Sequence, residues 1–265
     1  MMDKRSNRYE QNCQFLNRHN GALYVRYQAH KTIFPRLPLK RVPSKSGLDS
    51  LVIADTNGDI PLHSLYDPRR EAVQKTKEAC AGDNIFGIVV FGLGLGYHFE
   101  ELVKCKRPEQ SLIVIEPSWH IFEEFLHATV LDDPALFRTT TFIVGQTGER
   151  FSLSFHAAVY RTLPGRSAVV ALDGESRYFA ELFAVMQEGR TAVQQKKAAA
   201  FDRFRQETDR LQERFGAELP LRTLCERIIA AHTGTEPYRM TELILLDYYR
   251  MMQLQKRTVS VYDGE

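Results

Sequence analysis

The chain has 265 residues, of which 43% are hydrophobic and 26% charged. These values exclude a fibrous or low-complexity chain and fit a soluble globular protein with one large domain or two smaller ones. The net charge is +2, but residues 1–45 hold ten Lys and Arg against two Asp and Glu. Such a basic arm can attract phosphate, nucleic acid or an acidic partner, or it is simply solvated.

The cysteines and the apolar windows bound the class of protein further. The four cysteines, Cys13, Cys80, Cys105 and Cys225, form no C-x-x-C pair. Their spacing supports neither a zinc site nor a disulfide framework, so we expect no metal and a cytoplasmic location. No window approaches the roughly 18 apolar residues of a membrane span, and the amino terminus lacks an apolar signal-peptide core. We therefore expect no membrane partner.

Residues 1–80 are predicted to form a small β-rich cap with a linker helix. Residues 22–27 alternate weakly between apolar and polar side chains, as a half-buried strand does. Residues 51–54 and 60–62 flank Asn57-Gly58, a dipeptide that favours the positive φ angles of a hairpin turn. The pattern therefore predicts a β-hairpin ahead of the linker helix.

The linker helix is predicted from its first residues. Asp67 can cap a helix that begins at Pro68, the residue type favoured at the first helical position, and that runs to about Cys80. Tyr66 and Asp67 would then lie between the cap and the next domain, where they could meet a ligand. The alternative is that Asp67 only caps the helix.

The most informative segment lies in a Rossmann-like domain predicted over residues 81–175. Residues 88–91 form an uninterrupted apolar run, typical of a parallel strand that is covered on both faces. Gly92, Gly94 and Gly96 follow, and they allow a tight turn and a close approach of backbone to ligand. A helix is predicted next.

That helix spans residues 97–105, and the strand after it, residues 112–115, ends on Glu116. The acid follows the first glycine by 24 residues, where it can accept hydrogen bonds from ribose hydroxyls. Tyr97 and His98 come directly after the last glycine and could line the mouth of the pocket. His98 could also act as a base near neutral pH, although a histidine at a helix start is more often structural.

The glycine spacing is G-x-G-x-G rather than the G-x-G-x-x-G of dinucleotide sites. It is closer to the nucleoside pocket of methyltransferase-type Rossmann folds, with a mostly parallel sheet. The ligand would then be a nucleotide or nucleotide-sugar, with S-adenosylmethionine as the alternative. The structural alternative is that the glycines only permit close helix–strand packing around an empty pocket.

The α/β pattern continues beyond the acid. Ser118 can cap a helix whose apolar positions run over residues 121–126. Two further strands are predicted at residues 141–144 and 167–172. We therefore expect at least four strands in the main sheet.

Residues 176–265 are predicted to be a helical carboxyl-terminal extension. Residues 176–215 hold one long helix or two joined ones, without proline, and two more helices are predicted at residues 221–231 and 241–255. Long helices of this kind cross between domains or pack against a partner chain. The long helix is thus a candidate for homo-oligomer contacts.

Three segments together, SLYDPRREA, VVFGLGLGYHFEEL and IVIEPSWHIFEEFL, resemble the amino-terminal part of the motility accessory factor (Maf) family. These flagellin glycosyltransferase-like proteins are related to MptE-type hydroxymethylpterin pyrophosphokinases. The resemblance implies a cytoplasmic role in the transfer of nonulosonic acid sugars to Ser or Thr of flagellin. The Gly-Pro-Ser-Leu turn that opens the family's candidate catalytic domain has no counterpart here, which implies a shortened form with the Rossmann-like part only.

Two other hypotheses stay open. The glycine pattern with Glu116 suggests an S-adenosylmethionine-dependent methyltransferase, although Val90 stands where many such enzymes have an acid. The missing carboxyl-terminal half suggests instead a non-catalytic interaction module, with the long basic helix as its docking surface. Flagellin or another protein and a small nucleotide are the expected partners, and nucleic acid is not.

Overall fold

The computed structural model describes residues 4–56, 58–82, 85–161, 166–215, 220–232 and 245–246. The chain divides into two compact units, Met1–Gln195 and Lys196–Glu265. The cap and the Rossmann-like part therefore share one unit, and the three-part division predicted at residues 80 and 175 stays a prediction.

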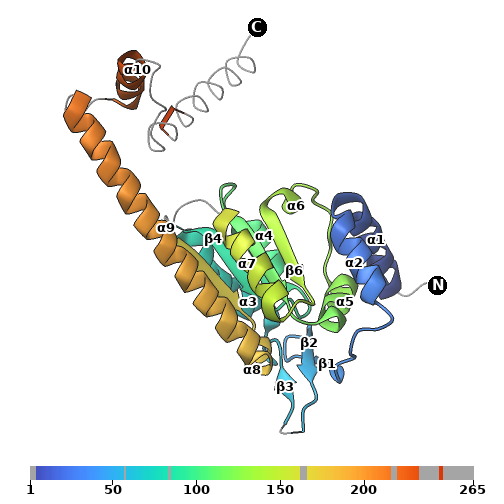
Figure 1. Ribbon diagram of the computed structural model, residues 1–265. Helices are drawn as coiled ribbons and strands as arrows, with labels where there is room; N and C mark the ends of the chain where they lie inside the picture. Colours follow the sequence, from blue (N-terminus) through green and yellow to red (C-terminus); the bar gives the residue numbers. More distant parts are fainter. Residues whose placement is uncertain are drawn as a thin grey trace. The chain divides into compact units, whose positions relative to one another are not determined.

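The main sheet has four parallel strands in the order β6-β5-β4-β7 (Figure 1). This order corresponds to strands 3-2-1-4 of the doubly wound arrangement, in which the strand order reverses between β4 and β7. The predicted α/β fold with a mostly parallel sheet is confirmed. Its strands are β4 (Ile85–Phe91), β5 (Ser111–Glu116), β6 (Thr140–Val144) and β7 (Arg166–Ala171).

Helices cover both faces of this sheet, because alternate side chains of each buried strand point to opposite faces. Val90 and Val114 pack in a cluster with α4 (Tyr97–Cys105) and α5 (Trp119–Ala128). Val89 and Ile113 pack with α7 (Gly148–Arg161) and α9 (Ala180–Phe215) on the other face. Helices α3 (Pro68–Ala81), α6 (Leu136–Thr139) and α8 (Asp173–Tyr178) also belong to the first unit.

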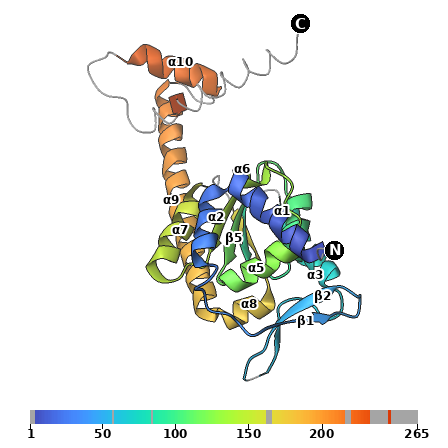
Figure 2. The same ribbon diagram turned by 90° about the vertical axis from the view of Figure 1, so that its right-hand side faces the viewer.

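The amino terminus differs from the prediction. It forms two helices, α1 (Lys4–His19) and α2 (Gly21–His30), which lie beside α5 (Figure 2). The strand predicted at residues 22–27 is therefore wrong, and the cap is less β-rich than expected. Tertiary packing decides the outcome, since the Tyr27 side chain is fully buried and the Asn12 amide donates to the carbonyl of Leu126 at 2.8 Å.

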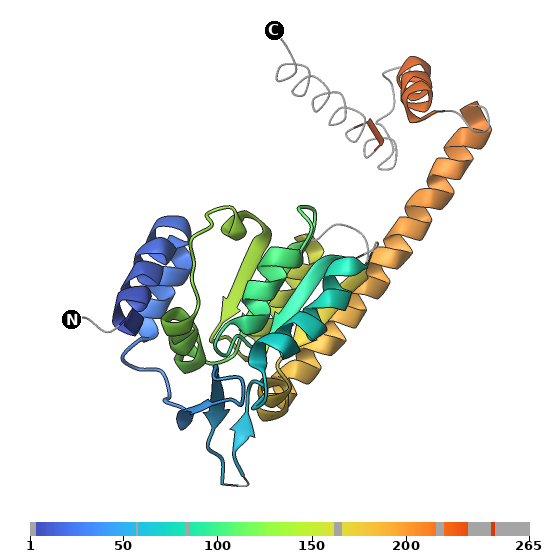
Figure 3. The ribbon, with the colours of Figure 1, turned by 180° about the vertical axis from the view of Figure 1, so that it is seen from behind.

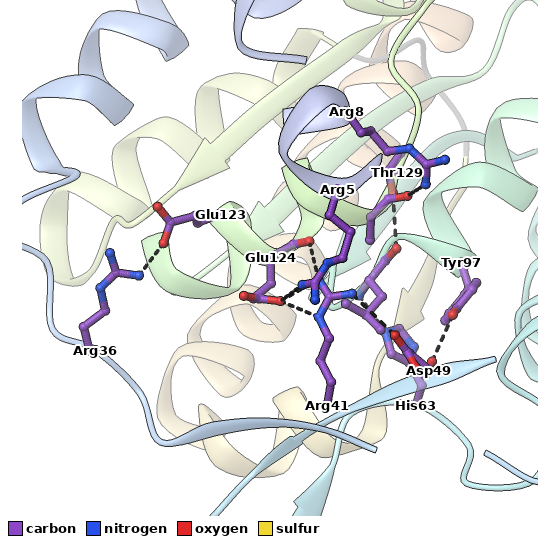
Figure 4. Close-up of polar contacts among 12 residues, drawn as sticks. Arg5, Arg8, Arg36, Arg41, Asp49, His63, Tyr97, Glu123, Glu124 and Thr129 are labelled. Carbon is purple, nitrogen blue, oxygen red and sulfur yellow. Dashed lines mark hydrogen bonds and ion pairs between the residues drawn. The ribbon is translucent and has the colours of Figure 1, made fainter. Parts of the chain in front are cut away.

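The predicted hairpin is confirmed within a small antiparallel sheet of β1 (Leu39–Pro43), β2 (Asp49–Ile53) and β3 (Ile60–Pro61). Asn57 lies outside the described residues. The sheet sits at the carboxyl end of the main strands (Figure 1). Arg41 of β1 ties it to α5 through an ion pair with Glu124 at 2.6 Å (Figure 4).

A disulfide corrects the cysteine prediction. Cys80, at the end of α3, is bonded to Cys105, at the end of α4. The two helices lie side by side, as Figure 3 shows from behind. The pair is separated by 25 residues, so a search for short spacings misses it. Cys13 and Cys225 are free and buried.

The long helix predicted after residue 176 is confirmed as α8 and the 36-residue α9. The helix predicted at residues 221–231 is confirmed as α10 (Leu221–Ala231). Apart from residues 245–246, the helix predicted at 241–255 lies outside the described residues. Within the described part of the chain, none of the helices combines the length and hydrophobicity that a membrane crossing requires.

Candidate functional site

The glycine-rich turn joins β4 to α4 as predicted, and its shape requires glycine. Gly92, Gly94 and Gly96 have φ angles of +88°, +48° and +90°, a region that other residues rarely adopt. A Cβ atom on Gly92 would overlap the carboxyl group of Glu175, and one on Gly94 would overlap the His63 ring. The glycines therefore make room for side chains of this same protein.

Three successive amides of the turn are hydrogen-bonded to these side chains. The Leu93 N–H donates to Glu116 Oε2 at 2.9 Å, and the Gly94 N–H donates to Glu175 Oε1 at 3.0 Å. The Leu95 N–H donates to His63 Nε2 at 2.7 Å. These are the groups that would cradle a ligand in an open Rossmann turn, and here the protein fills that place itself.

Glu116 lies at the carboxyl end of β5, beside the turn, as the sequence predicts. Its side chain is fully buried, and its second oxygen accepts from the Ser118 N–H at 2.9 Å. Both oxygens are thus bonded to backbone amides. Because the carboxylate is fully buried, a ribose could reach Glu116 only if the surrounding protein moved, and this role stays a prediction.

Glu116 and Glu175 form a buried acid pair. Burial raises the pKa of Glu116 to about 7. Burial, and then the neighbouring Glu116, raises the pKa of Glu175 well above its usual range. Glu116 accepts two backbone N–H bonds and Glu175 only one, and Glu175 Oε2 has no hydrogen-bond partner among the described residues, so the shared proton belongs on Glu175.

Two buried histidines adjoin the turn. Burial lowers the pKa of His63 to about 3 and that of His98 to about 4, so both are neutral at pH 7. Their rings stack 6.0 Å apart. Since His63 Nε2 accepts from Leu95, its proton is on Nδ1. Neither this Nδ1 nor the two nitrogens of His98 has a hydrogen-bond partner among the described residues.

The other predicted residues lie apart from the turn amides. The Tyr97 hydroxyl donates to the carbonyl of Asp49 in β2 at 2.9 Å, so it braces the small sheet (Figure 4). Asp67 accepts from the N–H groups of Arg69 and Arg70 and caps α3, which is the alternative considered above. Tyr66 is 66% exposed.

A cleft with a volume of about 870 Å³ is next to this turn. Two of its lining residues are close in sequence to residues that bond the turn. Ser64 follows His63, and Asp173 lies two residues before Glu175. The predicted site is therefore divided between the closed turn and the open cleft. The cleft is lined by Ser64, Tyr66, Asp67, Arg70, Glu71, Gln74, Lys75, Glu78, Val169, Val170, Ala171, Asp173, Phe183 and Gln187.

The central part of the chain is similar to a known family. Residues 39–159 match the family described as the glycosyltransferase Maf N-terminal domain. The predicted resemblance to the amino-terminal part of the Maf family is confirmed. The matched segment holds the small sheet, the glycine-rich turn and Glu116, whereas β7 and Glu175 lie beyond it.

A solved structure is similar to this chain in its fold. The MAf glycosyltransferase from Magnetospirillum magneticum AMB-1 is similar with a TM-score of 0.51 and 15% sequence identity. The similarity covers 71% of this chain and 35% of that one. At this identity it shows the fold, which is Rossmann-like. This chain spans about a third of the length of that Maf protein, and no curated protein matches the sequence.

Sequence reasoning missed the two side chains that close the glycine-rich turn. Glu175 follows the end of β7 just as Glu116 ends β5, so an acid after the strand at residues 167–172 was the available signal. His63 immediately precedes the SLYDPRREA segment and carried no signal of its own. Its role depends on the small sheet reaching the turn from 32 residues away in sequence.

Proposed function

We propose that this protein serves flagellin glycosylation as a Maf-type amino-terminal module that supports the transfer of nonulosonic acid sugars in the cytoplasm. The match of residues 39–159 to the Maf N-terminal domain is the observation that supports this role. Flagellin is the protein partner that the proposal implies. Because the chain spans 35% of the solved Maf protein, we assign no catalytic residue to it.

The closed turn favours a module that binds and positions its partner over one that holds a nucleotide. A nucleotide-sugar at Gly92–Gly96 would have to displace Glu175 and His63 from the turn amides. S-adenosylmethionine would meet the same obstacle, and it would also lack an acid at Val90 for its ammonium group. These contacts weigh against the methyltransferase hypothesis.

The intact mass of flagellin tests the proposed role. We expect deletion of the gene in its own organism to lower the mass of flagellin by whole nonulosonic acid residues. Complementation with the gene should restore that mass, and complementation with the gene carrying an early stop codon should not. An unchanged flagellin mass after deletion would overturn the proposal.

Thermal unfolding with added ligands separates the ligand hypotheses. A ligand at 100 times its dissociation constant adds about 2.7 kcal/mol to the free energy of unfolding. We expect no shift with CMP, CMP-sugars or S-adenosylmethionine while the turn is closed. A shift with S-adenosylmethionine alone would replace the glycosylation role by a methyltransferase.

A further inference from the structure

The outer edge of β7 carries backbone groups that are free to pair with another strand. Among the described strands, β7 bonds to β4 only. The Leu172 N–H donates to the Phe91 carbonyl at 3.0 Å. Because alternate residues of a parallel strand bond to the same neighbour, this bond shows which residues of β7 face β4. Residues 168, 170 and 172 therefore bond inward to β4. The N–H and C=O groups of residues 167, 169 and 171 point outward.

Two side chains already occupy the ends of this edge. Arg190 donates to the Ser167 carbonyl at 3.0 Å, and Lys75 donates to the Ala171 carbonyl at 3.3 Å. Both contacts agree with carbonyl groups of residues 167 and 171 that point away from β4. Between them, no described residue bonds the N–H or C=O of Val169 or the N–H of Ala171. Such a short row of unpaired groups is a template for strand addition.

The open cleft runs along this free edge. It is lined by Val169, Val170 and Ala171 of this edge, by residues of α3, and by the apolar side chain of Phe183. Its volume of about 870 Å³ is within the range of about 300–1,000 Å³ found for ligand pockets. A segment entering it would meet backbone donors and an acceptor along one side.

The lining of the cleft is acidic on balance. Its four acids outnumber two cations, and one of the cations is already paired, since Lys75 lies 2.7 Å from Asp173 and 3.6 Å from Glu71. Glu78 is exposed and has no ion-pair partner among the described residues. An occupant with Lys or Arg side chains is therefore favoured over an anion. The acids are Asp67, Glu71, Glu78 and Asp173.

We propose that the cleft binds an extended, basic peptide segment of a partner protein, which adds as a strand to the outer edge of β7. Main-chain hydrogen bonds to Val169 and Ala171 supply affinity, and Lys or Arg side chains facing the acidic rim supply specificity. This inference goes beyond the glycosylation role and does not depend on it.

A peptide library tests this directly. The full chain is used to select from phage-displayed random heptapeptides, and the most enriched sequence is synthesised for titration by fluorescence anisotropy. We expect enriched sequences in which Lys or Arg alternates with apolar residues. Methylating the peptide's backbone nitrogens at alternate positions should raise its Kd tenfold or more in one of the two registers, because it removes the main-chain donors.

Protein variants locate the peptide. Val169→Pro removes an outward N–H but no bond to β4, and proline is tolerated at such edge positions, so Kd should rise tenfold or more. Glu78→Lys should also weaken binding, whereas Glu149→Lys on α7 should not. The thermal midpoint of each variant reports on its folding.

Three results would overturn the inference. They are a selection with no enrichment above background, a methylated peptide that binds as well as its parent in both registers, and a peptide whose affinity is unchanged by Val169→Pro and Glu78→Lys. The methylated peptide leaves the protein untouched, so it decides the question even if Val169→Pro fails to fold.

Discussion

Replacing Glu175 by glutamine tests the acid pair that closes the glycine-rich turn. Glutamine reproduces the protonated carboxyl group, because its amide oxygen can accept from the Gly94 N–H and its amide nitrogen can donate to Glu116. The native pair keeps a proton that the unfolded chain releases above a pKa of about 4.5. Above that pKa, each pH unit over which the folded pair keeps this proton lowers the free energy of unfolding by about 1.4 kcal/mol.

The raised pKa values fix the direction of the effect. Above pH 4.5 the folded state binds more protons than the unfolded state, because the pKa values of Glu116 and Glu175 are raised. The contribution of this pair to the free energy of unfolding is therefore greatest at low pH and is lost as the pH rises. We therefore expect the free energy of unfolding of Glu175→Gln to match that of the native protein near pH 4.5 and to exceed it by about 1.4 kcal/mol for each pH unit above 4.5 over which the folded pair keeps its proton. The histidine contributions are common to both proteins and cancel in the difference.

Urea unfolding at several pH values between 4.5 and 8 measures this difference. Trp119 is the chain's one tryptophan and is buried, so its fluorescence reports on the fold. Glu78→Gln, at an exposed position of α3, is the matched control and should show no pH-dependent difference. A gap between Glu175→Gln and the native protein that stays constant with pH would refute the shared proton.

Three further predictions concern the same unit. Buried His98 has a pKa lowered to about 4 and stays neutral in the fold, so the native protein loses stability as the pH falls from 6.5 to 5. In urea unfolding, His98→Phe should make this loss smaller by about 2 kcal/mol. An unchanged pH profile would contradict this. Cys80→Ser should lower the free energy of unfolding by about 3 kcal/mol, and dithiothreitol should lower it similarly in the native protein but not in the variant. Gly94→Ala should cost more than Gly148→Ala in thermal unfolding, because both have positive φ but only Gly94 packs against the His63 ring; equal losses would show that the ring does not restrict that position.

Local signals in the sequence determine much of the fold. The apolar run over residues 88–91, the glycines after it and the acid at residue 116 predicted a strand, turn, helix and strand that the structure confirms. Asp67 and Ser118 marked the starts of α3 and α5, since each caps its helix with its own side chain. These elements were predictable because each rests on neighbours within a few residues.

Long-range contacts determine what was missed. Helix α2 forms where the sequence alternates weakly, because Tyr27 is buried against α5 from 96 residues away. The closure of the turn depends on Glu175, which reaches Gly94 from 81 residues along the chain. The spacing of glycines describes the turn but not what fills it, so an open pocket and a closed one share the same pattern.

Hydrogen exchange at the glycine-rich turn tests the central claim most directly. If Glu116, Glu175 and His63 bond the turn amides, the N–H groups of Leu93, Gly94 and Leu95 should exchange as slowly as those of β4 in the protein without added ligand. Fast exchange at these amides, beside protected amides in β4, would show that the turn is open to water and would contradict the account.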